Sequence, residues 1–493
     1  MYQLVLRGLQ VLVAVSIIFS FLGILPYNGF LQIISFFVLT ISCYSANFLF
    51  AKIFKVTTNV ESSSISSFIL FFVLLPIESL NDFWWVAGLG VLSQLSKYVL
   101  AIQKKHIFNP VAITVFIGGL LGSGLALWWV GSSVMIIPVI ILGFLVLRKV
   151  KRFSLFLSFI FASVISLSIF GILNDLSVYD ALSQAILSGP IIFFGTIMLT
   201  EPLTTPPSRK LQIFYGIIVG GLFGSIFSFG PIYSTPALAL IIGNVFSYIV
   251  SPRARLVLKL KEKNKLIADV YEFVWDKGEQ KIDFEAGQYL EWTLGHKSPD
   301  NRGNRRYFTV ASSPTERDLR LGVKFYDNSS SFKKKLNSME IGETVTASQV
   351  AGEFTIPEDK NKKLVWIAGG IGVTPFRSMA KSLFDTGEKR NVVLFFSNRT
   401  AKDIVYKEIF DSAKNLGLKT IYAVGDLAGV PPQENIRVGM INAEMITKEV
   451  PDFKERAFYI SGPRVMVTAF EETLSKLGVN RRDIKTDFFP GYV

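Results

Sequence analysis

Cysteine and histidine are almost absent from this sequence of 493 residues. The single cysteine, Cys43, excludes an internal disulfide, a cysteine-ligated iron–sulfur cluster and a cysteine-rich zinc site. The two histidines, His106 and His296, leave little scope for histidine-based metal chemistry. We therefore expect no metal site and assign no catalytic cysteine or histidine.

Charged residues are scarce in the first half of the chain. Residues 1–250 contain 12 Lys and Arg and 6 Asp and Glu, whereas residues 251–493 contain the other 71 of the 89 charged residues. So few charges are atypical of a soluble domain, and the chain is too long for one ordinary domain. The net charge of +13 comes without a basic stripe interleaved with aromatic residues, so nucleic acid is not an expected partner.

Hydrophobic segments separated by short connectors make up this first half. A membrane-spanning helix needs about 20 mostly apolar residues. By that standard we predict about ten spans, near residues 8–25, 31–51, 65–80, 83–101, 111–130, 132–148, 153–173, 181–199, 211–229 and 235–251. Pro110 and the glycines that follow it make residues 109–124 the best candidate for a re-entrant segment.

The connectors alternate in charge. Basic residues gather in every second connector, as in Arg148–Arg152 and Arg209–Lys210, and acidic residues such as Asp175 occupy the connectors between. Because basic loops stay in the cytoplasm, this alternation predicts a multi-pass cell-membrane protein, in contact with lipid, with both termini in the cytoplasm. The one histidine of this half, His106, excludes a relay of two haems held by paired histidines, and we expect it at headgroup level.

One connector, residues 200–207, is chemically unusual. Its sequence is Thr-Glu-Pro-Leu-Thr-Thr-Pro-Pro, and it follows an apolar helix. Because proline breaks the helix, backbone N–H groups and the threonine hydroxyls are available to an anion or to the edge of a flavin. From the residues alone, a rigid turn with a solvated Glu201 is the simpler interpretation.

The connector belongs to a longer stretch that resembles a known membrane subunit. Residues Ile186–Arg209, ILSGPIIFFGTIMLTEPLTTPPSR, are similar to the D subunit of the Rnf electron-transport complex and the B subunit of the sodium-pumping NADH:quinone oxidoreductase. IFNPVAI, from Ile107, resembles the Asn-Pro-Ala segment of the same family. The resemblance implies a second flavin, FMN or riboflavin, beside Thr200, Glu201 and Thr204. This sequence lacks the Ser-Gly-Ala-Thr-like motif to which the family attaches FMN, so the implied flavin is non-covalent.

The pattern of the chain changes at residue 253. Residues 254–275 alternate as strands do, and short strands separated by Gly and Asn or Asp turns continue to Pro357. They predict an antiparallel β-barrel over residues 253–357. From residue 358, strands alternate with helices expected at 375–386, 402–416 and 464–477, which predicts an α/β domain with a parallel sheet over residues 358–493. The predicted organisation is a helical membrane domain, residues 1–252, followed by a soluble module of two domains.

Three motifs of this second half carry chemistry. Arg306–Thr309 offers a guanidinium fork for a pyrophosphate, an aromatic ring that can stack on a flavin, and a hydroxyl for the flavin edge. Gly369–Pro375 joins a strand to a helix, where glycines let the backbone approach a pyrophosphate. Ser461–Met466 also joins a strand to a helix, at the edge where ligands of parallel sheets gather.

In this order and spacing, the three motifs resemble the ferredoxin–NADP⁺ reductase superfamily. The resemblance implies FAD as cofactor and NAD(P)H as substrate. The implied flavin-binding residues are Arg306, Phe308, Thr309, Ser330 and Ser331, with Lys333 beside them. The implied residues for the nicotinamide nucleotide are Gly369, Gly370, Gly372, Thr374, Pro375, Gly462, Pro463 and Met466. Asp487, Phe489, Gly491 and Tyr492 match the family's terminal pattern, with Phe489 near the flavin face that nicotinamide approaches.

Residues Ser397–Thr400 follow the second predicted strand of the α/β domain. Their hydroxyls and Arg399 suit the 2′-phosphate of NADPH, whereas a carboxylate at this place would suit the ribose of NADH. The sequence favours NADPH slightly and leaves both nucleotides open.

The two resemblances together predict a membrane-bound flavoprotein oxidoreductase. Electrons from NAD(P)H would pass through FAD to a membrane-associated acceptor, which is a flavin, a quinone or an extracytoplasmic acceptor. No side chain need act as an acid or base, because the cofactor carries the chemistry. In the alternative interpretation, the helices are a transporter or a membrane anchor fused to a cytoplasmic flavin reductase, and the number of flavins per chain distinguishes the two.

Overall fold

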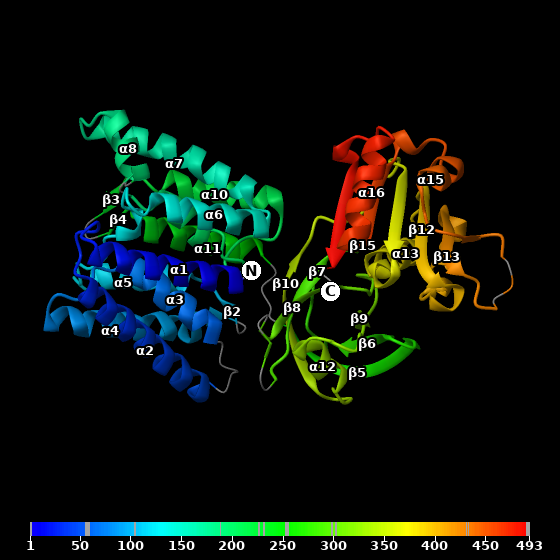
Figure 1. Cartoon of the computed structure of the whole chain (residues 1–493), viewed down its shortest axis with the longest axis horizontal. Coiled ribbons are helices and arrows are strands. Elements are labelled where there is room, and N and C mark those ends of the chain that lie inside the picture. Colours follow the sequence, from blue (N-terminus) through cyan, green and yellow to red (C-terminus); the bar gives the residue numbers. More distant parts are fainter. Residues whose placement is uncertain are drawn as a thin grey trace. The chain divides into compact units, whose positions relative to one another are not determined.

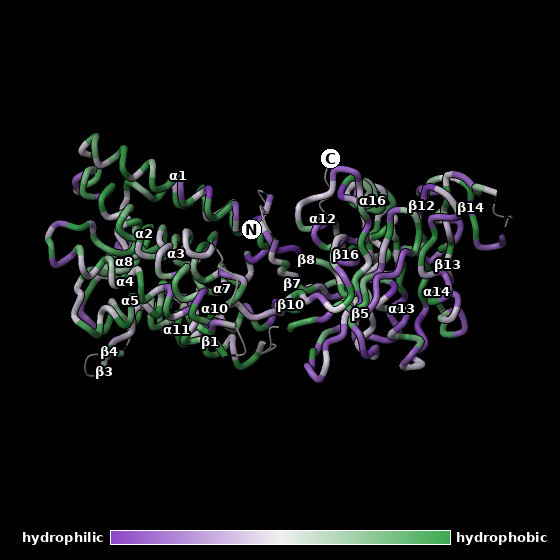
Figure 2. The backbone as a smooth tube through the Cα atoms, turned by 90° about the horizontal axis from the view of Figure 1, so that it is seen from below, coloured by the Kyte–Doolittle hydropathy of each residue, from purple (hydrophilic) through white to green (hydrophobic). Residues whose placement is uncertain are grey.

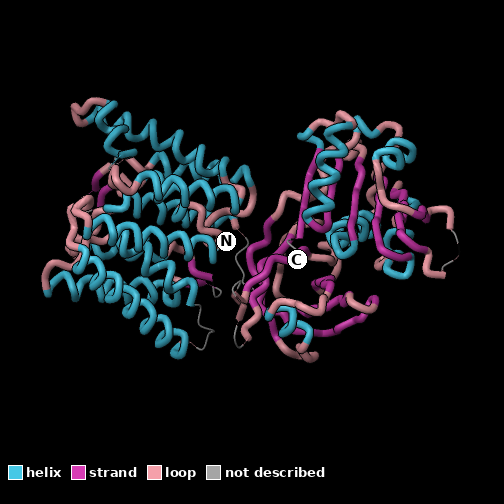
Figure 3. Tube along the Cα trace, in the orientation of Figure 1, coloured by secondary structure: helices cyan, strands magenta, loops and turns pink. Residues whose placement is uncertain are grey.

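The computed structural model describes residues 2–54, 60–102, 105–187, 189–224, 227–229, 232–251, 256–296, 299–300, 303–429, 431 and 433–489. It divides into a first unit, residues 1–254, and a second unit, residues 255–493 (Figure 1). The first unit is helical, whereas strands make up much of the second (Figure 3). Hydrophobic residues run along nearly every helix of the first unit, and they alternate with hydrophilic residues in the second (Figure 2).

Polar side chains cap several helices of the first unit. Asn28, Ser79, Asn109, Ser208 and Thr235 each accept a hydrogen bond from the first-turn backbone of the helix that follows, which satisfies N–H groups that have no partner within the helix. The helices are α1 (Tyr2–Phe21), α2 (Gly29–Ile53), α3 (Val60–Val73), α4 (Leu80–Val99), α5 (Pro110–Leu120), α6 (Ile136–Val150), α7 (Phe153–Leu173), α8 (Val178–Leu187), α9 (Ile191–Phe193), which continues as the π-helical turn η2 (Phe194–Met198), α10 (Arg209–Gly221) and α11 (Pro236–Val250).

The prediction of about ten membrane spans is wrong by helix length and composition. A helix forms in each predicted segment, but among the described residues only three, α1, α2 and α7, are long and apolar enough to cross a membrane. The pair formed by α8 and residues 191–198 is bent by 63° and would make a fourth if it is one span. Glycine and proline shorten other helices: α5 has 11 residues and ends ahead of Gly122 and Gly124, whose φ angles are positive.

The two halves of the first unit repeat one pattern of helix packing. Helix α1 packs on α3, α2 on α4 and α4 on α5, and in the same way α6 packs on α9, α7 on α10 and α10 on α11. A two-stranded hairpin precedes the last helix of each half, β1 (Ala101–Ile102) with β2 (Lys105–His106) and β3 (Ser228–Phe229) with β4 (Ile232–Tyr233). Each of those last helices begins with proline after a capping side chain. The repeats contact each other through α1 with α6 and α5 with α11.

The first sheet of the second unit is antiparallel, as predicted. Its six strands lie in the order β8-β7-β10-β5-β6-β9. Their bounds are β5 (Leu256–Ile267), β6 (Val270–Asp276), β7 (Tyr289–Thr293), β8 (Arg305–Thr309), β9 (Leu319–Lys324) and β10 (Thr344–Ala351), and the short helix α12 (Ser331–Asn337) lies between β9 and β10 in the chain. One face of this sheet buries a core that includes Trp275 and Trp292.

The second sheet is parallel, also as predicted, and its strands lie in the order β14-β13-β12-β11-β15-β16. Their bounds are β11 (Leu364–Gly369), β12 (Val392–Thr400), β13 (Leu418–Asp426), β14 (Ile436–Val438), β15 (Ala457–Pro463) and β16 (Ile484–Phe489). The helices are α13 (Thr374–Thr386), α14 (Lys407–Ser412), α15 (Ala443–Glu449) and α16 (Arg464–Lys476). The single helix predicted at 402–416 is wrong, because Tyr406 has the left-handed φ of 60° and divides the segment into short pieces.

Candidate functional site

Strand β8 presents Arg306 and Phe308 on one of its faces, because side chains alternate along a strand. The Arg306 guanidinium lies 5.4 Å from the ring centre of Phe332 on α12, and the Phe308 ring lies 5.7 Å from the same ring. Thr309, at the end of the strand, is buried. The structure therefore brings Arg306 and Phe308 to the start of α12, where Ser330 and Ser331 lie.

A carboxylate joins Arg306 to the start of α12. Asp300 accepts hydrogen bonds from Arg306 Nη2 at 2.8 and 3.1 Å and from the backbone N–H of Ser331 at 3.1 Å. Ser330 caps the helix by accepting a hydrogen bond from Lys333 N. Arg306 and the N–H of Ser331 thus already bind one oxyanion, the Asp300 carboxylate. The same donors therefore fit the phosphate of a flavin nucleotide. Sequence reasoning missed Asp300, which lies six residues before Arg306 in a polar loop.

Tyr326 is a second residue that the sequence motifs did not reveal. Its side chain is half exposed, and the ammonium groups of Lys333 and Lys324 lie 5.3 and 5.9 Å from its ring centre. An exposed ring beside two cations suits a nucleobase that carries phosphate groups. The signal in the sequence is an aromatic residue shortly before Ser330, two residues after the end of β9.

The glycines of the Gly369–Pro375 loop pack against the turn after β15. A Cβ at Gly369 would lie 2.3 Å from Met466 Sδ, and a Cβ at Gly372 would lie 2.6 Å from the Cα of Gly462. Gly370 has a φ of 51°, and its Cβ would meet nothing within 4 Å. The loop therefore leaves backbone open on one side, as the approach of a pyrophosphate requires.

The remaining loop residues begin the helix that follows. Thr374 is the first residue of α13 and Pro375 lies at its N-terminal turn, where a missing N–H costs nothing. The Thr374 hydroxyl donates to the carbonyl of Ile371 at 3.2 Å. The helix N-terminus adds a positive dipole to this edge of the parallel sheet.

The same edge collects residues from other strands. Pro463 ends β15 and pairs with Phe489, the last residue of β16. Arg399 is exposed near the end of β12, and the buried amide nitrogen of its half-buried neighbour Asn398 has no hydrogen-bond partner among the described residues. Gly491 and Tyr492 of the predicted terminal pattern lie outside the described residues.

The predicted residues of the first unit lie in a network of side chains of this chain. Glu201 accepts a hydrogen bond from Asn109 Nδ2 at 2.8 Å and one from the Thr204 hydroxyl at 3.4 Å. The Thr200 hydroxyl donates a hydrogen bond to the carbonyl of Thr196, and the Thr200 carbonyl accepts one from the Arg152 guanidinium. Glu201 is therefore held in a structured site and is not the solvated residue of a plain turn.

The network extends through three further elements. His106 Nε2 lies 3.9 Å from a carboxylate oxygen of Glu201, beyond hydrogen-bond distance, and has no hydrogen-bond partner among the described residues. Asn244 on α11 accepts from the backbone N–H of Asn109 and donates to the Tyr215 hydroxyl, and both side chains are fully buried. Sequence reasoning missed Asn244 and Tyr215 because each lies among apolar residues on its helix and belongs to no motif. In the described part of the chain, no group of three His, Cys, Asp or Glu side chains is placed to hold a metal.

Two family models match the second unit. Residues 257–356 match the oxidoreductase FAD-binding domain and residues 366–472 match the oxidoreductase NAD-binding domain. The first contains β8 with Arg306 and the start of α12, and the second contains the Gly369–Pro375 loop and the turn after β15.

Curated relatives match the same half of the chain. A flavohemoprotein of Bacillus cereus is 25% identical over 243 residues, which are 48% of this chain and 60% of the relative. The glycine betaine monooxygenase reductase subunit of Chromohalobacter salexigens is 26% identical over 200 residues, which are 40% of this chain and 53% of the relative. The chain thus spans little more than half the length of these relatives.

A solved structure with the same pair of domains is also similar. The flavohem-like FAD/NAD-binding domain of the nitric oxide dioxygenase of Vibrio cholerae is 21% identical, with a TM-score of 0.41, and the match covers 48% of this chain and 98% of that one. The family models and curated relatives agree with the resemblance drawn from the three sequence motifs. The second unit therefore carries the FAD-binding and NAD-binding domains of an NAD(P)H oxidoreductase flavoprotein of the ferredoxin reductase-like superfamily.

Proposed function

We propose that this chain is a membrane-bound oxidoreductase that takes electrons from NAD(P)H through FAD and delivers them to an acceptor held by the first unit. The observation that carries the proposal is the combination of the two nucleotide domains with apolar helices that can cross a membrane. The proposed location is the cell membrane, with the second unit in the cytoplasm. The proposed division is a helical domain at 1–252, an FAD domain at 253–357 and a nucleotide domain at 358–493.

In the second unit, the residues of this chain hold and orient the two nucleotides. Bound FAD would supply the hydride acceptor for the nicotinamide and the capacity to pass two electrons on one at a time. Arg306 and the backbone at Ser331 would hold the FAD phosphates, and Phe308 and Thr309 would lie along its ring. Gly369, Gly370 and Gly372 would admit the pyrophosphate of the nicotinamide nucleotide, while Gly462, Pro463, Met466 and Phe489 would border the nicotinamide. No residue is proposed to exchange a proton with the substrate.

In the first unit, we place the acceptor at the network around Glu201, where it would be a non-covalent flavin or a quinone. Ionisable side chains are costly among apolar helices and mark functional sites there. A π-helical turn, which is frequent at functional sites, leads into Thr200, Glu201 and Thr204. His106 Nε2 adds a buried ring nitrogen that has no hydrogen-bond partner among the described residues.

The proposed nucleotide is NADPH. Arg399 is exposed at the end of β12, and the amide nitrogen of Asn398 beside it has no hydrogen-bond partner within the described ranges; both are donors, and donors suit a 2′-phosphate. Replacement of Arg399 with Ser should lower kcat/KM for NADPH about tenfold and leave that for NADH nearly unchanged. Equal effects on both nucleotides would contradict the NADPH proposal.

The proposed function is tested on the full chain, purified in detergent and returned to sealed vesicles. The extracted flavins are counted by mass spectrometry, and NADPH oxidation is followed with a soluble dye and with a membrane quinone. Two flavins per chain, or one flavin with rapid quinone reduction, support the conduit. One flavin with dye reduction alone supports the alternative, in which the helices anchor a flavin reductase or transport another solute.

A further inference from the structure

The antiparallel sheet of the second unit is closed by contacts between its two edge strands. The chain continues from β8 into Ala311, whose N–H donates to the carbonyl of Arg320 on β9 at 2.9 Å. The Ser312 hydroxyl accepts from the N–H of Arg320 at 3.1 Å. We call residues 311–316 together with Arg320 the seam. Its first residue comes two positions after Thr309 of the flavin motif.

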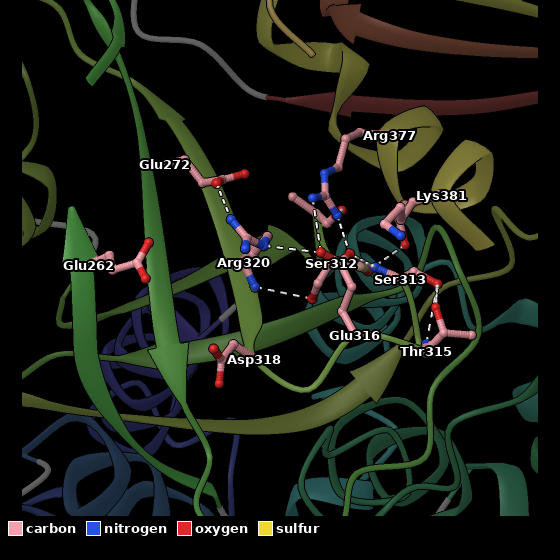
Figure 4. Close-up of polar contacts among 12 residues, drawn as sticks. Glu262, Glu272, Ser312, Ser313, Thr315, Glu316, Asp318, Arg320, Arg377 and Lys381 are labelled. Atoms are coloured by element: carbon pink, nitrogen blue, oxygen red, sulfur yellow. Dashed lines mark hydrogen bonds and ion pairs between the residues drawn. The ribbon is translucent and has the colours of Figure 1, made fainter. Parts of the chain in front are cut away.

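Helix α13 of the nucleotide domain lies on the seam (Figure 4). Arg377 Nη1 donates to the carbonyl of Ala311 at 3.1 Å, and Ser378 Oγ donates to the carbonyl of Ser312 at 2.6 Å. Both side chains are buried, with Arg377 only 4% exposed. The nucleotide domain thus binds the backbone of residues 311 and 312, which directly follow the strand that carries the flavin motif.

Glu316 holds the Arg377 guanidinium in a defined orientation. Its two carboxylate oxygens pair with Nη1 and Nη2 of Arg377, the second at 3.0 Å. The same carboxylate accepts from the N–H of Ser313 at 2.6 Å and from Arg320 Nε at 3.1 Å. Because Glu316 is itself held by two other groups of the seam, a rotation of the Arg377 fork would break several hydrogen bonds together.

The contact joins the two nucleotide sites by short stretches of chain. Arg377 follows Pro375 of the glycine-rich loop by two residues, as Ala311 follows Thr309. Strand β9 also lies directly against this loop, since a Cβ at Gly322 would be 2.8 Å from Thr374 Cγ2. We propose that Arg377 is a positioning residue that fixes the start of α13 against the seam and thereby sets the approach of the nicotinamide to the flavin. This inference rests on the proposed function of the second unit.

A buried arginine within the nucleotide domain supplies a matched control. Arg456 is 6% exposed, donates to both carboxylate oxygens of Asp452 at 2.7 and 3.1 Å, and donates to the carbonyl of Leu364 at 3.2 Å. It makes the same kinds of contact as Arg377, but all its partners belong to one domain. Loss of its fork should lower stability without changing the relation between the two sites.

The experiment compares Arg377→Lys with Arg456→Lys in the full chain. Lysine keeps the charge and loses the planar fork, so it cannot hold a carboxylate and a carbonyl in the same arrangement. Reduction of bound FAD by NADPH is followed anaerobically in single turnover, together with the long-wavelength absorbance of nicotinamide stacked on flavin. FAD content and the melting temperature are measured on the same samples.

We expect Arg377→Lys to retain FAD, to lose the stacking absorbance and to reduce its flavin about tenfold to a hundredfold more slowly, since small displacements at a reacting centre have effects of this size. Arg456→Lys should melt at a lower temperature with a rate within about twofold of the wild type. Glu316→Gln keeps the shape of the side chain that binds Arg377 and should reproduce part of the decrease in the rate of flavin reduction. The variant that combines Glu316→Gln with Arg377→Lys should be no slower than Arg377→Lys alone.

A wild-type rate in Arg377→Lys, or equal slowing in both lysine variants, would overturn the positioning role. If Arg377→Lys fails to fold, Glu316→Gln alone decides: slow flavin reduction with normal FAD content supports the inference, and a normal rate overturns it. A wild-type chain without FAD or without NAD(P)H oxidation contradicts the proposed function itself, which is a different result from a kinetically silent variant.

Discussion

The two units use buried polar groups in different ways. In the first unit, Asn109 donates from its side chain to Glu201 and from its backbone to Asn244, so side chains from three separate segments make the site. In the second unit, glycines and backbone groups make much of the site, and a Cβ at Gly369 or Gly372 would collide with a neighbour. A site built from backbone groups requires glycine at particular positions, and a sequence motif shows those positions directly. A site built from side chains far apart in the sequence leaves a much weaker pattern.

The largest expected effect is in the second unit and isolates its flavin site. Arg306→Ala removes a charge-assisted contact that typically contributes about 2–3 kcal/mol, so FAD affinity should fall about thirtyfold or more. Titration of the flavin-depleted protein with FAD measures the change. Arg305→Ala is the matched control, because Arg305 precedes Arg306 on β8 and pairs with Glu291 on the neighbouring strand. Unchanged affinity in Arg306→Ala would show that the motif is misassigned.

The next effect is in the first unit and tests whether its polar network serves electron transfer. Replacing Glu201 and Thr204 together with Ala should leave NADPH oxidation with a soluble dye almost intact, because hydride transfer belongs to the second unit. Quinone reduction in vesicles should fall at least about tenfold, as expected when a functional carboxylate among apolar helices is lost. Glu78→Gln, an exposed carboxylate of the same unit, is the control. Full quinone activity and full flavin content in the double variant would favour the anchor interpretation.

The internal repeat of the first unit allows a third comparison. Asn109 and Thr235 cap the corresponding helices α5 and α11, and either change to Ala should cost about 1 kcal/mol of unfolding free energy. Asn109→Ala also removes a donor from Glu201, which should add about 1–3 kcal/mol. Denaturant unfolding in detergent measures both variants. Equal losses would mean that the Asn109–Glu201 contact contributes nothing to stability.

The smallest expected effect returns to the second unit. Asp300 holds the donors proposed for the FAD phosphates, and a carboxylate beside a diphosphate is repulsive. Asp300→Asn should therefore raise FAD affinity several-fold while lowering the melting temperature of the flavin-free protein. Weaker FAD binding would instead assign Asp300 the role of orienting Arg306.

Much of the second unit could be predicted from the sequence, because strand alternation and glycine-rich turns report the local backbone. The prediction of a single helix at 402–416 was wrong because Tyr406 adopts a left-handed conformation, which is usual for glycine and is not expected of tyrosine. Arg377 was not predicted, since its partners Ala311 and Glu316 lie more than 60 residues earlier in the chain. In the first unit, hydropathy located the helical segments but overestimated the spans, because glycine and proline end apolar helices within continuous apolar sequence.

The seam has a consequence for how such enzymes can be recombined. A hybrid that joins the flavin domain of this chain to the nucleotide domain of a relative would cross over near residue 357, between Glu316 and Arg377. The incoming helix would then contact the Glu316 carboxylate and the carbonyls of Ala311 and Ser312, which are arranged to accept from Arg377 and Ser378. A functional chimera should therefore transfer both domains as one cassette, or carry residues 311–320 along with the new helix, and natural exchange between lineages is subject to the same constraint.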